Sequence, residues 1–221
     1  MEEITNPKVE DSDPSGAPGT QGRIADALLD LCLERGYPDV TLPMVLERAG
    51  VDSGEFGRHY ADLEDCFLKI YTGYRDDIMG RIAAAVAEEP TWRGRIRAAA
   101  YTMLGYMEVD ERRTNFIVIE VRRAGERAVV SMGEAFEEMF DLLDSGRDER
   151  GRTDISRATA EAVGGTIFFR MNAAFEQGSM EAVRAKMPEM MYMAVLPYLG
   201  PEAAEEELRA TPPAASPGSG G

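Results

Sequence analysis

The sequence predicts an all-α protein, because three observations agree. Apolar residues recur at helical spacing along most of the chain, no segment alternates like a half-buried strand, and glycines and capping residues interrupt the pattern at helix-length intervals. With 221 residues, 44% of them hydrophobic, the chain is long enough to bury one sizeable core or two smaller ones. We expect about nine helices arranged in two domains.

Four helices are predicted in the N-terminal part, each bounded by a residue that favours a helix end. Gly36 and Gly50 stop the first and second helices in a conformation that glycine adopts easily. Thr41, Asp52 and Asp62 have side chains that accept hydrogen bonds from first-turn N–H groups, so they are the expected N-caps of the next three helices. The predicted helices span residues 23–35, 42–49, 53–60 and 63–87.

The remaining helices are longer and more apolar. Pro188 lies inside the last of them and is expected to bend or interrupt it. The polar run 145–152 is predicted to be a loop. The predicted helices span residues 92–107, 115–123, 126–143, 154–176 and 180–198.

Both ends of the chain have compositions that do not support a core. Residues 1–21 are rich in Pro, Gly, Ser and acidic residues and predict a disordered arm. Residues 201–221 pass from an acidic stretch to a Pro/Gly/Ser-rich one and predict a flexible tail. Between them we expect a helical domain over 22–70 and a larger helical domain over 71–200.

The composition restricts the environment and the partners. The formal net charge of −16 opposes loose adhesion to nucleic acid, so any DNA binding must depend on a local surface. Two cysteines are too few for a disulfide framework. The acidic, polar start and the short apolar runs predict neither a signal peptide nor a membrane span. We therefore expect a cytoplasmic protein that does not bind a membrane.

The short helices of the N-terminal domain have the spacing of a helix-turn-helix motif. Their residues strengthen the match: they include Leu33-Glu34-Arg35-Gly36-Tyr37, Thr41-Leu42, Leu46-Glu47-Arg48-Ala49-Gly50-Val51, Gly54, Arg58-His59-Tyr60 and Glu64. This stretch resembles the N-terminal domain of the TetR family, with a helix ending in E-R-G-[YF], a Thr opening the next helix, A-x-x-A-G-V, and a recognition helix ending in Y-x-H-F. The resemblance spans residues 22–70, and Tyr198-Leu199-Gly200 near the end resembles the family loosely.

The resemblance implies a homodimeric transcriptional repressor that binds a double-stranded DNA operator and is released by a small apolar or amphipathic effector. Helix 53–60 would enter the major groove, and Thr41 would hold a phosphate. Arg58 is the strong cationic candidate for a bidentate guanine contact, worth about 1–3 kcal/mol of discrimination. The candidate DNA-binding residues are Thr41, Ser53, Gly54, Glu55, Arg58, His59 and Tyr60.

The N-terminal domain departs from the family pattern in its charges. Ser53 replaces the usual lysine beside the recognition-helix glycine, Glu55-Phe56-Gly57 replaces Thr or Ala followed by Leu-Tyr, and Asp62-Leu63 replaces Ser-Lys. Residues 23–70 carry five basic and ten acidic residues, a formal net charge of −5. An alternative function therefore stays open, a TetR-like module that binds a ligand or a protein and has a degenerate DNA-binding domain.

Four of these acidic residues have the spacing of helix caps. Asp52 with Glu55, and Asp62 with Asp65, are spaced as reciprocal capping boxes, in which acids also complement the helix dipole. Carboxylates at these N-termini would occupy the places where phosphates bind. Glu55 has a second interpretation, as an acceptor for a cytosine amino group.

The larger domain is rich in Met and aromatic residues. These residues predict either an ordinary core or an adaptable apolar cavity for the effector. Glu120 and Arg170 lie in otherwise apolar helices and are expected to be ion-paired, with each other as the first candidate pairing; polar ligand recognition is the other interpretation. The candidate ligand-binding residues are Met103, Tyr106, Met107, Phe116, Ile119, Glu120, Phe136, Phe168 and Met171.

Two features of the last helices predict a homodimer. Small residues in 162–166 permit close approach of a second helix, and the Met-rich segment 187–193 offers a pliable apolar face. No enzyme activity is expected, because His59 is the only histidine and the sequence shows neither a nucleophile–base set nor a Gly-rich phosphate loop around it. No cofactor or metal site is expected either.

Overall fold

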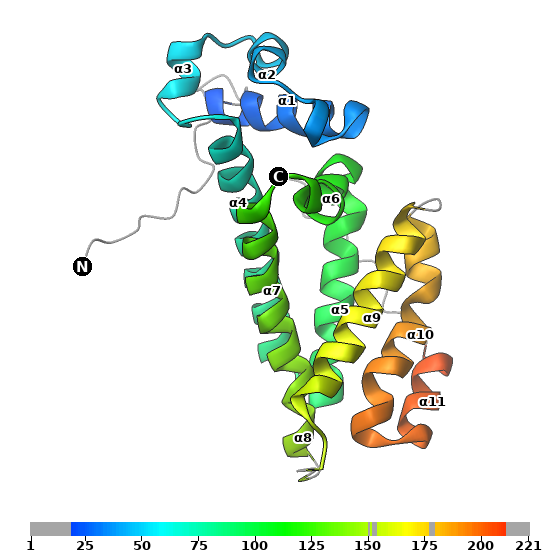
Figure 1. Cartoon of the computed structure of the whole chain (residues 1–221). Helices are drawn as coiled ribbons and strands as arrows, with labels where there is room; N and C mark the ends of the chain where they lie inside the picture. The colour runs from blue at the N-terminus through cyan, green and yellow to red at the C-terminus, as the bar shows by residue number, and fades with distance from the viewer. Residues whose placement is uncertain (1–18, 150, 152–153, 177–179, 211–221) are drawn as a thin grey trace, which may run out of the picture. The chain divides into compact units, whose positions relative to one another are not determined.

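In a computed structural model, which describes residues 19–149, 151, 154–176 and 180–210, all regular structure is helical (Figure 1). The all-α prediction is therefore confirmed. Residues 1–18 of the predicted arm lie outside the described residues, as do 211–221 of the predicted tail. No described helix is long and apolar enough to cross a membrane. The elements are α1 (Thr20–Arg35), η1 (Tyr37–Asp39), α2 (Leu42–Ala49), α3 (Ser53–Gly57), α4 (Leu63–Ala87), α5 (Trp92–Val109), α6 (Glu111–Val118), η2 (Glu120–Arg123), α7 (Glu126–Asp144), α8 (Gly146–Glu149), α9 (Arg157–Glu176), α10 (Met180–Leu199) and α11 (Pro201–Arg209), where η denotes a 3₁₀ helix.

The described residues form two compact units that do not follow a single cut along the chain. The first unit contains the described residues up to Asp76 together with Arg112–Ser131. The second contains Asp77–Glu111 and the described residues from Met132 onward. The sequence predicted one boundary at residue 70, whereas the structure assigns a later segment, 112–131, to the N-terminal unit. Segment 112–131 joins the first unit because it packs against helices far earlier in the chain, and sequence composition does not reveal such long-range contacts.

The core of the first unit joins α1, α4 and α6. The apolar stripe predicted for the first helix is buried, including Ile24, Leu28 and Leu31. In α4, Phe67 is fully buried, and its ring lies 4.2 Å from the ring of Phe116 in α6. Aromatic pairs of this kind contribute about 0.5–1.5 kcal/mol beyond the area they bury. This contact is one reason why the later segment packs with the N-terminal helices.

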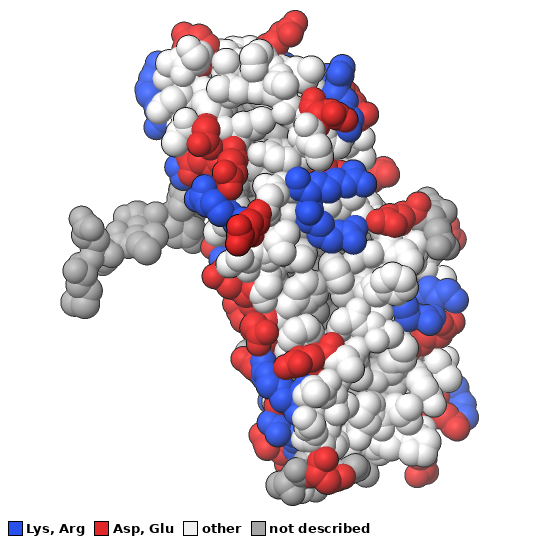
Figure 2. All heavy atoms as spheres, viewed as in Figure 1, with Lys and Arg blue, Asp and Glu red and all other residues white. Residues whose placement is uncertain are grey.

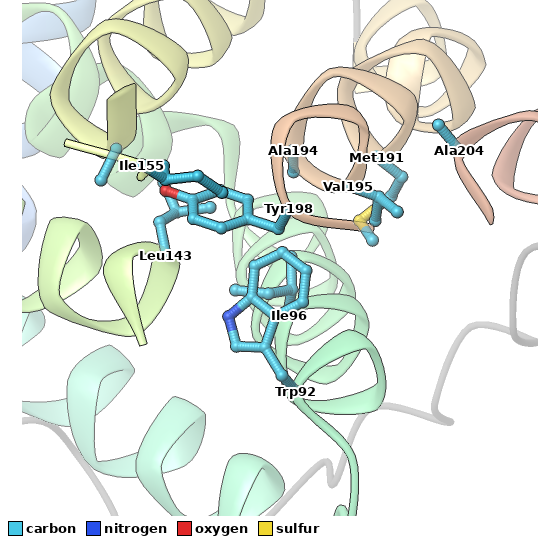
Figure 3. Close-up of a cluster of buried hydrophobic side chains, with 10 residues drawn as sticks. Trp92, Ile96, Leu143, Ile155, Met191, Ala194, Val195, Tyr198 and Ala204 are labelled. Atoms are coloured by element: carbon cyan, nitrogen blue, oxygen red, sulfur yellow. The ribbon is translucent and has the colours of Figure 1, made fainter. Parts of the chain in front are cut away.

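The core of the second unit is centred on Trp92, at the beginning of α5 (Figure 3). Its ring faces Tyr198 of α10 with centroids 4.8 Å apart, and its Nε1 donates a hydrogen bond to the Leu142 carbonyl at 3.0 Å. The buried members of this cluster are Trp92, Ile96, Leu143, Ile155, Ala160, Met191, Ala194, Val195, Tyr198 and Ala204.

A second cluster in the same unit lies where α10 packs against α5 and α9. Its buried members are Leu104, Val183, Met187 and Met190, and partly buried residues such as Met171 and Phe175 pack on them. The α10 helix continues through Pro188, so the predicted interruption there does not occur. Packing on both sides holds this helix together despite the lost backbone hydrogen bond.

The predicted tail is helical where the structure describes its beginning. In α11, Glu207 is 2% exposed, and its carboxylate binds Arg93 and Arg97 of α5, with Arg97 Nη2 2.6 Å from Oε1. Burial of a carboxylate is tolerated when arginines and hydrogen bonds satisfy it. The acidic composition alone predicted a flexible tail. The arginines that hold Glu207 lie more than a hundred residues earlier in the chain, so the local sequence gives no sign of them.

The predicted loop 145–152 also contains a short helix, α8. Its first residue, Gly146, passes so close to Trp92 that a Cβ there would lie 2.5 Å from the indole ring. The α8 residue Glu149 accepts a hydrogen bond from the Trp92 backbone N–H at 3.1 Å. Contact with Trp92 therefore orders a segment that its polar composition predicted to be a loop.

A second close approach gives a testable expectation. A Cβ on Gly164 of α9 would lie 2.6 Å from the ring of Phe140. Gly164→Ala should therefore lower the free energy of unfolding by about 1 kcal/mol, since overpacking of about 1–3 kcal/mol outweighs the gain in helix propensity. The control Gly80→Ala, in α4 with no atom within 4 Å of its Cβ, should raise it by about 0.5–1 kcal/mol. Urea unfolding of both variants measures the difference, and equal shifts would contradict the close packing.

Candidate nucleic-acid interface

The helices α2 and α3 form a tight helix-turn-helix. The turn depends on Gly50, whose left-handed conformation (φ +63°) ends α2 and lets the Val51 N–H donate a hydrogen bond to the Leu46 carbonyl at 3.1 Å. Only three residues separate α2 from α3, and the buried side chains of Val51 and Phe56 anchor the second helix. The remaining faces of α3 are open to a partner.

The N-terminus of α3 is closed by its own carboxylates. The Glu55 N–H donates to Asp52 Oδ1 at 2.7 Å, and the Asp52 N–H donates to Glu55 Oε2 at 3.1 Å. This confirms the predicted capping box. The Glu55 carboxylate is thus engaged in holding its own helix, although it was also a candidate for a base contact.

The N-terminus of α4 is also closed by carboxylates, but the predicted reciprocal capping box is only half formed, because Asp65 accepts from the Ala61 N–H and not from the Asp62 N–H. The Asp65 N–H donates to Asp62 Oδ1 at 2.8 Å, while Asp65 Oδ2 accepts from the Ala61 N–H at 2.9 Å and pairs with Lys69 at 2.9 Å. Burial alone would raise the pKa of Asp65, but the hydrogen bonds from Ala61 and Lys69 outweigh it and lower that pKa. An anionic carboxylate therefore occupies the position where a phosphate would bind.

The predicted recognition helix 53–60 ends at Gly57, so the candidates Arg58, His59 and Tyr60 lie directly after α3. Ser53, Gly54 and Arg58 are exposed and His59 is half-buried, whereas Tyr60 is buried with its ring 5.3 Å from that of Phe56. Within the described part of the chain, the Arg58 guanidinium has no carboxylate partner. It is therefore available for an external anion or a base edge.

Thr41 lies at the N-cap position of α2, but its side chain makes no capping hydrogen bond. The prediction that its hydroxyl caps the helix is therefore wrong. Pro43 in the first turn of α2 has no N–H to satisfy, so the helix needs fewer capping bonds there. Thr41 is exposed, and its hydroxyl is free to contact a partner.

Several acidic residues of the N-terminal domain form ion pairs with basic residues of the same unit. Arg112 of α6 binds Asp30 at 2.9 Å and Asp26 at 3.4 Å, and Arg48 binds Glu34 at 2.8 Å. The described residues of the whole unit carry eleven basic and thirteen acidic residues, a formal charge of −2, because 112–131 is basic. Figure 2 shows acidic and basic side chains in adjacent positions over one face of the protein.

The candidate ligand-binding residues divide between the two units. Phe116, Ile119 and Glu120 belong to the first unit, and the other six belong to the second. Among these six, the rings of Phe136 and Phe168 lie 4.6 Å apart in an edge-to-face arrangement. The others are Met103, Tyr106, Met107 and Met171, of which Tyr106 and Met107 are buried.

The expected pairing of Glu120 with Arg170 is wrong. Glu120 instead accepts hydrogen bonds from the Tyr37 N–H at 2.6 Å and from Arg123 Nη1 at 3.1 Å, while Arg170 pairs with Glu189 of α10. Partners close in the fold satisfy each charge, and the two residues belong to different units. Among the described residues, no group of three or more His, Cys, Asp or Glu is placed to hold a metal ion.

Comparison with known proteins gives matches among solved structures only. No protein-family model and no curated protein sequence matches the chain. Among solved structures, the fatty acid degradation regulator FadR of Bacillus halodurans matches with a TM-score of 0.66 and 14% identity, covering 79% of this chain and 94% of its own. A bacterial regulatory protein in the TetR family from Rhodococcus RHA1 matches with a TM-score of 0.61 and 13% identity, covering 79% and 96%.

The chain has the fold of the TetR family. FadR of Bacillus subtilis, solved in complex with stearoyl-CoA, matches as well, with a TM-score of 0.63 and 14% identity, covering 80% of this chain and 97% of its own. Because the match takes in nearly the whole length of each neighbour, the TetR fold includes both the helix-turn-helix and the helical body of this chain.

The two cysteines of the first unit give a test of its core. Both are buried, and burial raises the pKa of the Cys32 thiol to about 12, with the charge of Glu120 adding to it; burial raises the pKa of Cys66 further. The thiols should stay protonated from pH 7 to 9, so an aromatic disulfide reagent should label neither in the folded protein. Rapid labelling of both should follow unfolding in guanidinium. Fast labelling before unfolding would show that this core is open.

Proposed function

We propose that this protein is a sequence-specific DNA-binding transcriptional regulator. The observation that carries the proposal is the tight α2–α3 pair, directly after which Arg58 is exposed without a carboxylate partner among the described residues. The likeness to the folds of FadR and of a TetR-family regulator supports it. These neighbours are regulators, which also supports a role other than catalysis.

In this proposal α3 enters the major groove of an operator. Arg58 makes a bidentate contact with a guanine, and Ser53 and Gly54 allow the helix to approach the base edges closely. Thr41 and His59 contact phosphates and fix the orientation of the domain. Because acids close the N-termini of α3 and α4, few phosphates are neutralised, and the salt dependence of binding should be shallow.

A second function is favoured by the carboxylates that close the N-termini of α3 and α4. The carboxylates of Asp52, Glu55, Asp62 and Asp65 hold N–H groups that would otherwise bind phosphate. In this alternative the protein no longer binds DNA and acts as a ligand- or protein-binding module. The binding experiment below distinguishes the two functions.

We further propose a homodimer formed through α9 and α10, with repression as its mode of action. In α10, Met187, Met190 and Met191 are buried in the chain's own core, so the support for the interface comes from α9. One face of α9 leaves Ala158, Ala162, Gly165 and Thr166 exposed, followed by Phe169, which is 71% exposed. The Thr166 hydroxyl donates to the Ala162 carbonyl at 2.7 Å, so it needs no outside partner. A second copy covering this face would bury an aromatic ring that a monomer leaves in water.

The proposed effector is a small apolar or amphipathic molecule bound in the second unit. The proposal is supported by half-buried apolar side chains: Phe136 and Phe168, whose rings are in contact, and Met171, which packs on the buried cluster of α5 and α10. The Bacillus subtilis FadR neighbour was solved with stearoyl-CoA, which is amphipathic, so long-chain acyl-CoAs belong in the first set of compounds. A ligand-screened thermal-shift assay on the whole chain would identify the class.

DNA binding is tested by selection from genomic fragments at low salt. The unaltered protein should enrich a specific sequence, and Arg58→Ala should weaken binding to it by about 10–100-fold, since a bidentate guanine contact contributes about 1–3 kcal/mol. The control Arg35→Ala removes an exposed arginine at the end of α1 and should have little effect. Flat enrichment at every salt concentration would support the degenerate alternative.

The dimer is tested by light scattering at micromolar concentration. The protein should have twice the mass of its 24.3-kDa chain, and Phe169→Lys should shift it toward monomer because a charge would be buried in the interface. The matched control is Val109→Lys, which alters another exposed apolar residue, 68% exposed, at the end of α5. A monomer in the unaltered protein, or equal effects of the two variants, would contradict the α9 interface.

A further inference from the structure

Glu120 is a buried carboxylate that binds the turn between α1 and α2. The residue is 1% exposed, and its Oε2 accepts a hydrogen bond from the Tyr37 backbone N–H at 2.6 Å. Its Oε1 accepts from Arg123 Nη1 at 3.1 Å. A buried carboxylate is strongly unfavourable without such partners, so this contact fixes the turn relative to η2.

The shape of the turn brings its backbone close to this carboxylate. Gly36 has a φ of +82°, which favours glycine. A Cβ at Gly36 would lie 3.4 Å from Arg123 Nη1 and 3.7 Å from Glu120 Oε2. The chain therefore passes the Glu120–Arg123 pair at a residue that has no side chain, and the next N–H points at the carboxylate.

Aromatic contacts of the Tyr37 side chain hold the same turn. The Tyr37 ring lies 4.6 Å from the ring of Phe67 in α4, and Phe67 lies 4.2 Å from Phe116 in α6. Both the backbone and the side chain of Tyr37 are thus linked to the 112–131 segment, the backbone through Glu120 and the side chain through Phe67 and Phe116.

Polar contacts attach the rest of the 112–131 segment to α1 and α4. Arg112 binds Asp30 and Asp26 of α1. Arg127 lies 3.7 Å from Glu64 at the beginning of α4, and Arg75 of α4 donates to Ser131 Oγ at 2.9 Å. The segment therefore holds the two helices that flank the α2–α3 pair in the chain.

We propose that Glu120 is a positioning residue for the α2–α3 pair, so that DNA affinity depends on where the 112–131 segment holds the α1–α2 turn. The proposal rests on the proposed DNA-binding function. The turn sets where α2 begins, and the short turn at Gly50 makes α3 follow α2. The segment continues into α7, whose later residues belong to the second unit, so the chain itself connects that unit to the contact.

The first test measures backbone amide hydrogen exchange in the whole chain without DNA. Glu120→Ala should speed exchange of residues 37–51 by about tenfold or more, because a hydrogen bond to a charged group is lost, while α9 and α10 stay unchanged. Glu120→Gln, which keeps one acceptor, should have an intermediate effect. The control Glu126→Ala removes an exposed carboxylate six residues away and should change little.

The second test measures affinity for the selected operator and for unrelated DNA. Glu120→Ala should lose about tenfold or more in operator affinity and keep its affinity for unrelated DNA, because α3 is displaced while the charged groups remain. Operator binding should in turn slow exchange at Tyr37 in the unaltered protein, since coupling between two sites is reciprocal. If Glu120→Ala fails to fold, Glu120→Gln perturbs the same contact more mildly.

The outcomes separate three cases. Exchange that rises equally in both units, with operator affinity of the folded protein unchanged, would assign Glu120 a purely structural role and overturn the proposal. Unchanged exchange at Tyr37 in Glu120→Ala would overturn it as well. If the turn loosens but the unaltered protein binds no DNA, the proposed function fails and the positioning role fails with it, while the Glu120 contact itself is established.

Discussion

Compensation of negative charge is the constraint on which most of this structure depends. The chain has 40 acidic and 24 basic residues, so a carboxylate that leaves water must compete for few cations. Two solutions recur: a carboxylate caps a helix N-terminus, as Asp52 does, or it binds partners far away in sequence, as Glu207 binds two arginines and Glu120 binds the Tyr37 N–H. Both solutions fix backbone geometry, because the partner of the carboxylate is held by a helix or a turn.

This constraint changes how the acidity of the helix-turn-helix domain is understood. As an isolated stretch, residues 23–70 carry a charge that would repel DNA. In the folded unit the basic 112–131 segment supplies cations such as Arg112 and Arg127. The formal charge of the described residues of the unit is therefore only −2. The acidic residues therefore stabilise the unit through caps and ion pairs. In the proposed function, binding at α3 depends on Arg58 more than on the overall charge.

The sequence predicted best where the physics is local. Gly50 and the Asp52–Glu55 pair each act within one turn of chain, so the α2–α3 geometry and its capping box could be anticipated from spacing alone. The all-helical fold followed from apolar periodicity in the same way. Prediction failed for Thr41, because its position at the N-cap was correct but a hydroxyl hydrogen bond depends on a rotamer that spacing does not determine.

The sequence by itself therefore determined the all-helical fold class, the helix-turn-helix and its resemblance to a family. Only the tertiary structure decided which partners the buried charges take: Glu120 binds the Tyr37 N–H and Arg123 instead of Arg170, and Glu207 holds α11 where a solvated tail was expected. The physical reason is that periodicity and capping act over three or four residues. An ion pair acts between any two residues that packing brings within about 4 Å, and the sequence does not record that proximity.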